Sequence, residues 1–419
     1  MAVDFDLICR RDSLGSLLAA AILARAGCRV LLLPPRAEVR PEPEFLVPVA
    51  RGYPAAVLSG LVKSEALPQN LLSWRDSAGS LRQWPGFSAS EAPGEEAWLE
   101  LEKLWRLIDN CMRRQLEMPV ASLTGTGRML WLLVRDELLR ENRTRRLNDW
   151  LVSAGIDGAG RDFWRCLIPL LTLSRFADPP LLAFAYGAAV LARPEGWFPV
   201  VGLKAQLLAI LRSHGADFSG EVEWGPVFDG KWYIGVGRDR QAQRRSTVYL
   251  ADSDPEVLRR EVDSADQRLD FKRQIELAEP GFVVYEEGKD ETLPEKDALY
   301  HLECGSGHDF TGSLLVGPGL GESGRRVGYR FRPAGGPDQG DNPAAGERTW
   351  GWSPRLPAMM GGGFLPLTKG FCRFYQVGWH NLPGFGLGGL VYAARQAAVK
   401  IWTNDLRRDP AGLDGGSGR

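Results

Sequence analysis

The sequence predicts an α/β protein with more than one domain, and three observations lead to this prediction. The chain has 419 residues, more than one hydrophobic core usually organises, so two or three domains are expected. Its start alternates between apolar strand-like runs and an Ala- and Leu-rich helical run. Its last part contains a strand-like run, a glycine-rich turn and a long helical run.

The N-terminal segment has the order strand, turn, helix, strand. Phe5–Cys9 is a short apolar run suited to a buried strand, and Leu14–Ala26 is a helical run whose small residues allow close packing on a sheet. Gly27 ends that helix, and Cys28–Leu33 predicts a second buried strand. This βαβ start is typical of a domain with a parallel sheet.

The middle of the chain changes from loop-like to helical and then to stranded patterns. Residues 34–94 are rich in Pro, Gly and polar side chains, whereas apolar residues at helical spacing run from Glu95 to about Ala192. Gly196–Phe218 predicts a turn followed by a helix, and strand-like stretches with a hairpin near Gly230 come next. Residues 273–354 mix strand patterns with Gly- and Pro-containing loops.

Bulk properties exclude several classes of function. With 51 Lys and Arg against 52 Asp and Glu, the formal net charge is -1, which gives no electrostatic case for nucleic acid. The six cysteines contain no CxxC pair and the four histidines lack metal-ligand spacing, so we expect no metal site. Without an apolar run of signal-peptide length at the start, we expect reduced cysteines and a cytoplasmic protein.

The most apolar stretch is Cys166–Ala192. It is interrupted by Arg175, Asp178 and prolines, so a membrane-spanning helix is not expected. A buried pair of helices is the favoured interpretation. The wall of a lipophilic tunnel, or a surface that touches a membrane peripherally, are the alternatives.

Three glycine-rich segments have spacings that resemble phosphate-binding loops. Gly319–Gly324 lies between two strand patterns and therefore predicts a hairpin loop without a helix N-terminus for phosphate. Thr124–Arg128 has no preceding strand and predicts a loop at a helix start. Gly384–Gly389 lies between a strand and a helix that begins near Leu387, so its glycines would let a ligand approach the backbone closely.

The first turn has the context of a phosphate-binding turn but unusual residues. Such a turn needs glycine at its tight bend, at the pyrophosphate contact and at the helix–strand contact. These positions hold Arg11, Ser13 and Ser16 here, with Gly15 between the two serines. The acid that would bind ribose hydroxyls after the second strand is replaced by Pro34.

In their order along the chain, these segments resemble the phytoene desaturase branch of the FAD-dependent amine oxidase-type oxidoreductases. The start of the chain aligns with that family's strand-turn-helix-strand unit. Pro199 and Gly202 match its Pro-x-Gly-Gly segment, with Val201 at the first glycine. The closing flavin motif is matched by Val377, Gly378, Pro383, Gly384, Gly386 and Gly389.

The resemblance implies a discontinuous Rossmann-like FAD/NAD(P)-binding domain with an inserted α+β substrate domain. The first would comprise residues 1–75, 190–275 and 360–406, and the second residues 76–189 and 276–359, with a flexible tail at 407–419. In relatives the FAD pyrophosphate lies at the first turn and the flavin ring near the closing motif. Carried over by position, the cofactor-binding residues are Ser13, Gly15, Ser16, Gly378, Pro383, Gly384, Gly386 and Gly389, and no catalytic residue can be assigned.

Four departures from the family pattern lie on the expected path of FAD. Besides the first turn and Pro34, the family's Arg-x-Gly-Gly stretch is missing from residues 37–50, and Trp379 stands where the family has an acidic or small residue. We therefore predict an impaired FAD site and a non-catalytic scaffold or partner subunit of an active homologue. The alternative is a working FAD-dependent oxidoreductase that acts on a lipophilic or amine substrate.

The arginines of the first turn leave two hypotheses open. Arg11 and Asp12 would plug the vacated pyrophosphate site, or Arg10 or Arg11 would pair directly with phosphates. Expected partners are an active homologous oxidoreductase subunit or a second copy of the chain. A lipophilic small molecule and peripheral contact with a membrane are further expectations, and nucleic acid is excluded.

Overall fold

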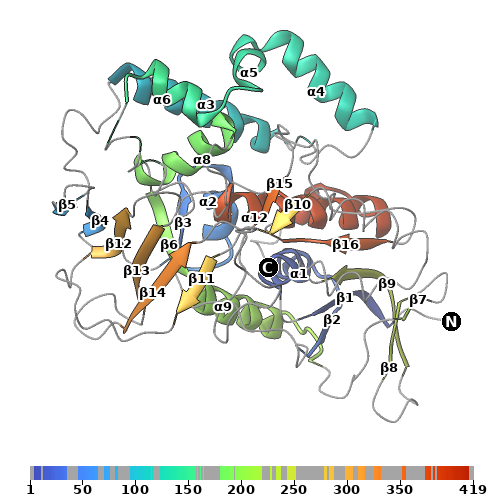
Figure 1. Ribbon diagram of the computed structural model, residues 1–419. Helices are drawn as coiled ribbons and strands as arrows, with labels where there is room; N and C mark the ends of the chain where they lie inside the picture. Colours follow the sequence, from blue (N-terminus) through green and yellow to red (C-terminus); the bar gives the residue numbers. More distant parts are fainter. Residues whose placement is uncertain are drawn as a thin grey trace.

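The computed structural model contains two six-stranded sheets and a group of helices at one end (Figure 1). Helices α1 and α9 lie between the two sheets in this view, α12 lies above β16 of the first sheet, and α3 to α6 lie together above them. The structure describes residues 4–10, 13–34, 46–64, 70–75, 81–83, 95–114, 116, 123–156, 158, 161, 164, 180–192, 194–218, 227–228, 233–236, 243–251, 278–280, 283–286, 298–304, 310–316, 325–331, 352–354, 373–378, 381–382 and 385–414.

The first sheet joins strands from both ends of the chain. Strand β1 (Phe5–Arg10) lies between β2 (Val30–Leu33) and β9 (Gln243–Ala251), and all three are parallel. Strand β16 (Phe374–Gln376) runs parallel to the second half of β9. The apolar runs at the start of the chain are buried on both faces, as parallel strands require. The expected βαβ start is confirmed.

An antiparallel hairpin extends this sheet. Strands β7 (Val227–Phe228) and β8 (Tyr233–Val236) pair antiparallel, and β8 pairs with the first half of β9. The hairpin predicted near Gly230 is therefore confirmed by the strands that flank it, although the turn itself lies outside the described residues.

Helix α1 (Leu14–Arg25) is buried on all sides from Leu14 to Ala24. It packs against β1, α9 (Val200–Ser213) and α12 (Gly386–Lys400), and its many alanines allow this close approach. Gly27 ends the helix with a φ of 88°, a conformation that glycine adopts without strain. The start of the C-terminal helix at Gly386 agrees with the start predicted near Leu387.

The second sheet is mainly antiparallel and includes two strands from early in the chain. Its order is β11 (Val283–Glu286), β14 (Arg325–Phe331), β13 (Phe310–Val316), β12 (Ala298–Cys304), β4 (Asn70–Arg75) and β5 (Leu81–Gln83). Strands β13 and β14 pair antiparallel on either side of the segment predicted as a hairpin loop. Strand β4 pairs with β12 although its residues fall within the predicted range 1–75, and the domain boundaries stay a prediction.

One short ribbon and one helix occupy segments that the sequence predicted as loop or turn, and a second ribbon lies within residues 273–354, where strand patterns were expected. Strand β3 (Leu46–Ala50) pairs with β6 (Pro194–Pro199), and β10 (Ala278–Pro280) pairs with β15 (Trp352–Pro354). Proline is tolerated in such two-stranded ribbons because an edge strand need not donate every amide. Helix α2 (Tyr53–Ser59) follows β3 directly.

The helical part agrees with the pattern that runs to Ala192. It contains α3 (Glu95–Arg113), α4 (Leu123–Arg135), α5 (Glu137–Asn142), α6 (Leu147–Ser153) and α8 (Leu181–Ala192). Rings of Trp98, Trp150, Trp164 and Phe184 form its core, with centroids 5.4 to 6.3 Å apart. None of the helices in the described ranges is long and apolar enough to cross a membrane.

One loop prediction in this part is wrong. Thr124–Arg128 lies inside α4 rather than in a loop before it. The apolar residues that follow favour a helix strongly enough to include two glycines in its first turns. The apolar stretch predicted as a buried helix pair is described only in its second half, where Leu181–Ala189 of α8 is buried.

The residues after α12 are packed, in contrast to the flexible tail expected from residue 407. A π-helical turn (Ile401–Asp405) follows α12, and α13 spans Ala411–Asp414. Arg408 lies 3.2 Å from the carboxylate of Asp6, and Leu413 is buried in the core around α1. Only residues 415–419 of this segment lie outside the described part.

Candidate cofactor site

The candidate site lies at the carboxyl ends of the parallel strands. Arg10 and Leu33 face each other in the register of β1 and β2, so both strands end at the same edge. Ligands of open parallel sheets bind at this edge, next to the helix that follows the first strand. Strand β16 ends there too, which brings the closing motif to the start of α1.

Ser13 joins the first turn to the closing motif. It is the N-cap of α1, and its Oγ accepts a hydrogen bond from the Ser16 amide at 3.3 Å. The same hydroxyl donates to the carbonyl oxygen of Val377 at 3.2 Å. Both serines are buried, with exposed fractions of 1% and 0%. The Ser16 amide, which would face phosphate in a nucleotide-binding turn, is therefore bonded within the chain.

Gly15 permits close contact between α1 and the segment after β16. A methyl group built on Gly15 would overlap the carbonyl oxygen of Val377 and lie 2.7 Å from its carbonyl carbon. It would also lie 2.9 Å from Cδ1 of Leu390 in α12. The one glycine that the first turn retains is thus required by packing within the protein.

Arg10 is the residue of the first turn that the structure places most clearly. Its side chain is only 5% exposed, although it follows a buried strand, and its Nη1 donates to the carbonyl oxygen of Pro34 at 3.3 Å. A guanidinium group therefore connects the ends of β1 and β2, next to the position where the family resemblance places the ribose-binding acid. Arg11 and Asp12, the predicted plug, lie outside the described residues.

The closing motif folds back on itself before α12 begins. The Gly378 amide donates to Oδ1 of Asn381 at 2.8 Å, and the Asn381 amide donates to the Gly378 carbonyl at 3.2 Å. Both residues are buried. Pro383 and Gly384, which the resemblance also assigned to cofactor binding, lie outside the described residues. The role of Gly378 in cofactor binding stays a prediction.

The start of α12 is covered by aromatic rings. Gly386 adopts a φ of 54°, and the preceding Phe385 has no side-chain capping bond. A methyl group built on Gly388 would lie 2.6 Å from Cε1 of Tyr186 in α8 and nearer still to its Oη. The rings of Tyr186 and Phe385 have centroids 5.5 Å apart. A methyl group on Gly389 would lie 2.7 Å from Cβ of Phe385, so close packing explains both glycines.

Tyr186 was not recognised from the sequence because it lies in an uninterrupted apolar pattern. Burial, and secondarily the charge of Asp109, raise its pKa well above the usual range of tyrosine. The phenol therefore stays neutral beside the start of α12. In the sequence, this position is marked by a tyrosine in a helical run that consists mainly of alanines and leucines. A buried tyrosine usually has a partner for its hydroxyl.

Asp109 of α3 organises the contact between α3 and α2. Its Oδ1 accepts the Tyr53 amide at 2.6 Å and its Oδ2 accepts Nε of Arg113 at 2.7 Å. A methyl group built on Gly52 would lie 3.0 Å from Cγ of Asp109, so this glycine lets the carboxylate reach the start of α2. The ring of Tyr53 in turn lies 6.1 Å from that of Tyr392 in α12.

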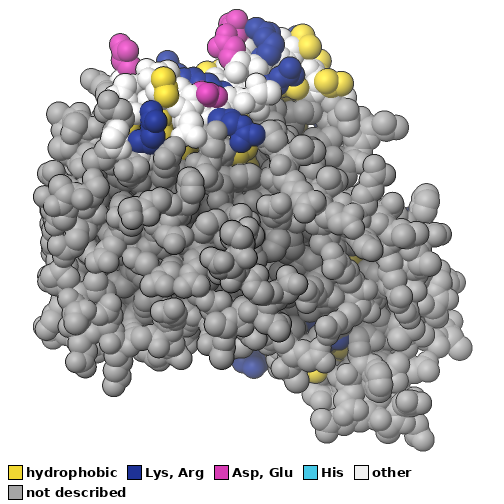
Figure 2. Space-filling model, viewed as in Figure 1, with side chains coloured by type: hydrophobic (Ala, Val, Ile, Leu, Met, Phe, Trp, Pro, Cys, Tyr) yellow, Lys and Arg dark blue, Asp and Glu magenta, His cyan; other side chains and the backbone are white. Residues whose placement is uncertain are grey.

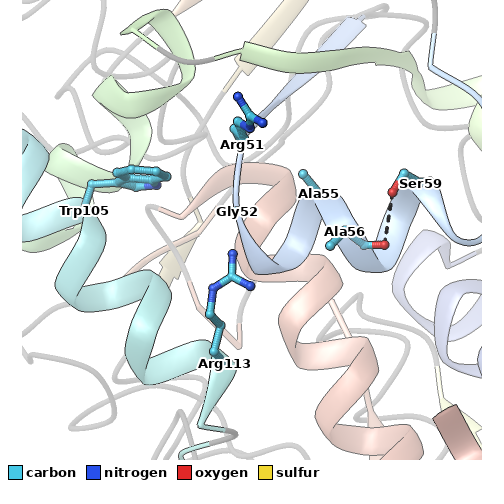
Figure 3. A pocket seen from close by; sticks show the side chains of 7 residues that line it. All are labelled: Arg51, Gly52, Ala55, Ala56, Ser59, Trp105 and Arg113. Atoms are coloured by element: carbon cyan, nitrogen blue, oxygen red, sulfur yellow. Dashed lines mark hydrogen bonds between the residues drawn. The ribbon is translucent and has the colours of Figure 1, made fainter.

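Two cavities lie beside α3, the first next to α2 and the second next to α8. The larger has a volume of about 400 Å³ and is lined by Arg51, Gly52, Ala55, Ala56, Ser59, Trp105 and Arg113 (Figure 3). The smaller has a volume of about 170 Å³ and is lined by Trp98, Leu101, Glu102, Trp105, Ala185, Ala188 and Ala189. Across the ranges that the structure describes, no three His, Cys, Asp or Glu residues come together in a way that could hold a metal.

Comparisons with known proteins agree with the fold. No protein-family model and no curated protein sequence matches the chain. A solved oxidoreductase from Methanosarcina mazei shares 14% identity at a TM-score of 0.55, covering 93% of this chain and 98% of that one. A double mutant of putrescine oxidase shares 13% identity at a TM-score of 0.57, covering 95% and 99%. The chain shares its fold with these solved proteins.

The predicted fold class is therefore confirmed: a nucleotide-type α/β domain with an inserted α+β domain. A third structure, Rab GDI from Plasmodium falciparum, shares 9% identity at a TM-score of 0.51, covering 98% of this chain and 99% of that one. Its name is not that of an oxidase. At such identities these comparisons establish the fold alone, and the phytoene desaturase branch stays a prediction.

Proposed function

We propose that this chain is a non-catalytic relative of the amine oxidase-type oxidoreductases that acts as a scaffold or as the partner subunit of an active homologue. The observation that carries the proposal is the buried side chain of Arg10, bonded to the Pro34 carbonyl across the ends of β1 and β2. The ribose hydroxyls of FAD need a hydrogen-bond acceptor at the end of the second strand, whereas a guanidinium group has only donors.

Three further contacts support the same function. The Ser16 amide is bonded to Ser13, the Gly378 amide is bonded to Asn381, and Val377 fills the space over Gly15. Each of these groups would have to be released before a pyrophosphate could bind through the backbone. A buried group that loses its partner costs about 1–3 kcal/mol, so several such changes oppose cofactor binding strongly.

The experiment that tests this proposal is a measurement of flavin content. We expect the purified full-length protein to lack flavin absorbance and to bind no FAD in an equilibrium titration at micromolar concentrations. A yellow protein, or stoichiometric uptake of FAD, would contradict the proposal. The double variant Arg10→Ala with Pro34→Glu restores an acceptor and removes the guanidinium, and any gain in FAD affinity in this variant would identify Arg10 as the obstacle.

One observation favours the alternative, a working FAD-dependent oxidoreductase with an atypical turn. Among the described residues, the N-cap Phe385 gives the first turn of α12 no side-chain cap, and a helix N-terminus favours an anionic acceptor. Arg10 would then exchange the Pro34 carbonyl, at 3.3 Å a long bond, for a phosphate oxygen. In that case Arg10→Ala weakens FAD binding, which is the opposite of the result expected above.

A surface on α4 supports the association part of the proposal. Leu130, Trp131 and Val134 are 58%, 53% and 75% exposed, and the guanidinium of Arg135 lies 4.5 Å from the Trp131 ring centroid. Figure 2 shows hydrophobic side chains beside Lys or Arg side chains at this helical end. Exposed apolar groups clustered in this way are typical of protein interfaces, where Trp and Arg contribute most.

Sedimentation velocity of the full chain, alone and mixed with an active homologous oxidase, tests this association. We expect the chain to form a complex, either with a second copy of itself or with the oxidase. The variant Trp131→Ser should abolish that complex. Val152→Ser, at a similarly exposed site on α6, serves as the control and leaves the complex intact. A monomer in both samples would contradict the subunit role.

A further inference from the structure

The larger cavity combines positive charge with an apolar wall. Arg51 comes from the turn before α2 and Arg113 from the end of α3, while Ala55, Ala56 and Trp105 supply the wall (Figure 3). Its volume of about 400 Å³ lies within the range of sites for small molecules, about 300–1,000 Å³.

Arg113 is held in a defined position. Its Nε donates to Oδ2 of Asp109 at 2.7 Å, and Asp109 is itself buried and fixed by the Tyr53 amide. This bond uses one edge of the guanidinium. The two terminal nitrogens have no other partner in the described part of the chain and are available at the cavity. Figure 3 shows the side chain reaching from α3 towards Gly52, with Arg51 on the far side of that glycine.

The smaller cavity lies behind Trp105 and is mainly apolar. Trp105 lines both cavities, so its side chain is a wall that the two share. Ala185, Ala188 and Ala189 of α8 line the smaller one, and their short side chains leave the space. Its one charged residue, Glu102, is paired with Arg106 at 2.6 Å.

We infer that the larger cavity is a binding site for an organic carboxylate with an apolar tail. Arg113 binds the carboxylate through its terminal nitrogens, because a guanidinium matches the two oxygens in geometry and charge. Trp105, Ala55 and Ala56 contact the tail. None of the described residues assigned to cofactor binding lines this cavity, and the inference does not rest on the proposed function.

Calorimetric titration of the full-length protein with octanoate, below its micelle concentration, tests the inference. Acetate, 1-octanol and octylamine are titrated in parallel. We expect octanoate to bind at least tenfold more tightly than each of the other three, because only octanoate has both groups. Acetate that binds as tightly as octanoate excludes a tail site, and octanol that does so excludes a role for the charge.

Two variants assign the binding to these residues. Arg113→Met keeps the length of the side chain but removes its charge, and we expect octanoate affinity to fall about tenfold to a hundredfold. Arg140→Met removes an arginine of similar exposure, paired with Glu137 on α5, and should leave the affinity unchanged. Equal loss in both variants, or no loss in Arg113→Met, would overturn the assignment.

A third variant tests the space itself. Ala56 is exposed and lines the larger cavity, so Ala56→Phe fills the cavity without entering the core. We expect it to abolish octanoate binding while its melting temperature stays that of the wild type. Undiminished binding in a folded Ala56→Phe protein would place the ligand elsewhere.

Discussion

Two helices begin at the same edge of the first sheet, and they differ in the hydrogen bonds that cap their first turns. Helix α1 is capped by Ser13, whose hydroxyl also bonds to Val377. Helix α12 begins without a side-chain cap, in a glycine-rich segment pressed against the rings of Tyr186 and Phe385. The start of α1 lacks the glycine pattern, and the backbone of Val377 packs against it. The start of α12 kept its glycines, yet protein side chains occupy the space beside them. A matching glycine is therefore no sufficient sign of a ligand.

The largest expected effect is at the start of α1. Gly15→Ala would place a methyl group against the backbone of Val377, which cannot rotate away. We expect a loss of about 3 kcal/mol in unfolding free energy, measured by urea titration of the far-UV circular dichroism. Gly127→Ala in the exposed α4 has open space around it and should instead be stabilising by about 0.5–1 kcal/mol. Similar values for the two variants would contradict the packing role of Gly15.

The second effect tests whether the start of α12 can adapt. Gly388→Ala meets the far end of the Tyr186 side chain, which is able to move, so we expect a smaller loss of about 2 kcal/mol. Removing the hydroxyl with Tyr186→Phe should recover about 1 kcal/mol in the double variant. The same second change should not rescue Gly15→Ala. Additive losses at Gly388 and Tyr186 would show that the phenol is not the obstacle.

The third effect concerns the cap that only α1 possesses. Ser13→Ala removes both hydrogen bonds of the hydroxyl and leaves a buried amide and a buried carbonyl, at a cost of about 1–2 kcal/mol. Ser213→Ala, which removes an exposed hydroxyl at the end of α9, should cost less than about 0.5 kcal/mol. Thermal unfolding of the two variants side by side measures the difference, and equal melting temperatures would refute the role of the cap.

The smallest effect on stability is expected from two buried thiols, Cys28 before β2 and Cys111 in α3. Burial raises the pKa of Cys28 to about 12 and that of Cys111 to about 11, from 9.0. The folded protein therefore keeps protons that the unfolded chain loses above pH 9, so stability falls as pH rises through this range. Iodoacetamide at pH 8 should react slowly with both thiols in the native protein and quickly in urea. Rapid native labelling of Cys28 alone would show that the nucleotide-type domain opens more easily than the helical part.

The sequence predicted the elements that have a regular apolar period. The βαβ start, the helices of residues 95–192 and the C-terminal strand and helix were predicted because burial imposes a period of two or 3.6 residues. Strand β3 and strand β6 were missed because their prolines resemble loop signals, and only their pairing with each other reveals why proline is tolerated.

The candidate site was predictable in place but not in its contacts. The departures at Ser13, Ser16 and Pro34 located the edge of the sheet at which the site lies. The bonds from Ser13 to Val377 and from Arg10 to Pro34 depend on tertiary distances that no local pattern contains. Tyr186 and Asp109 were missed for the same reason, because each acts on a glycine of another element.

The bond between Ser13 and Val377 joins residues 364 positions apart. During synthesis at about 5–20 residues per second, the first βαβ unit therefore leaves the ribosome about 20–70 s before the segment that covers it. The face of the almost wholly apolar helix α1 that packs against α12 stays uncovered for that time. The demand for chaperones during biosynthesis should therefore be set by how long the cell takes to synthesise the residues between Ser13 and Val377, and slow codons in this part of the message should lower the yield of folded protein.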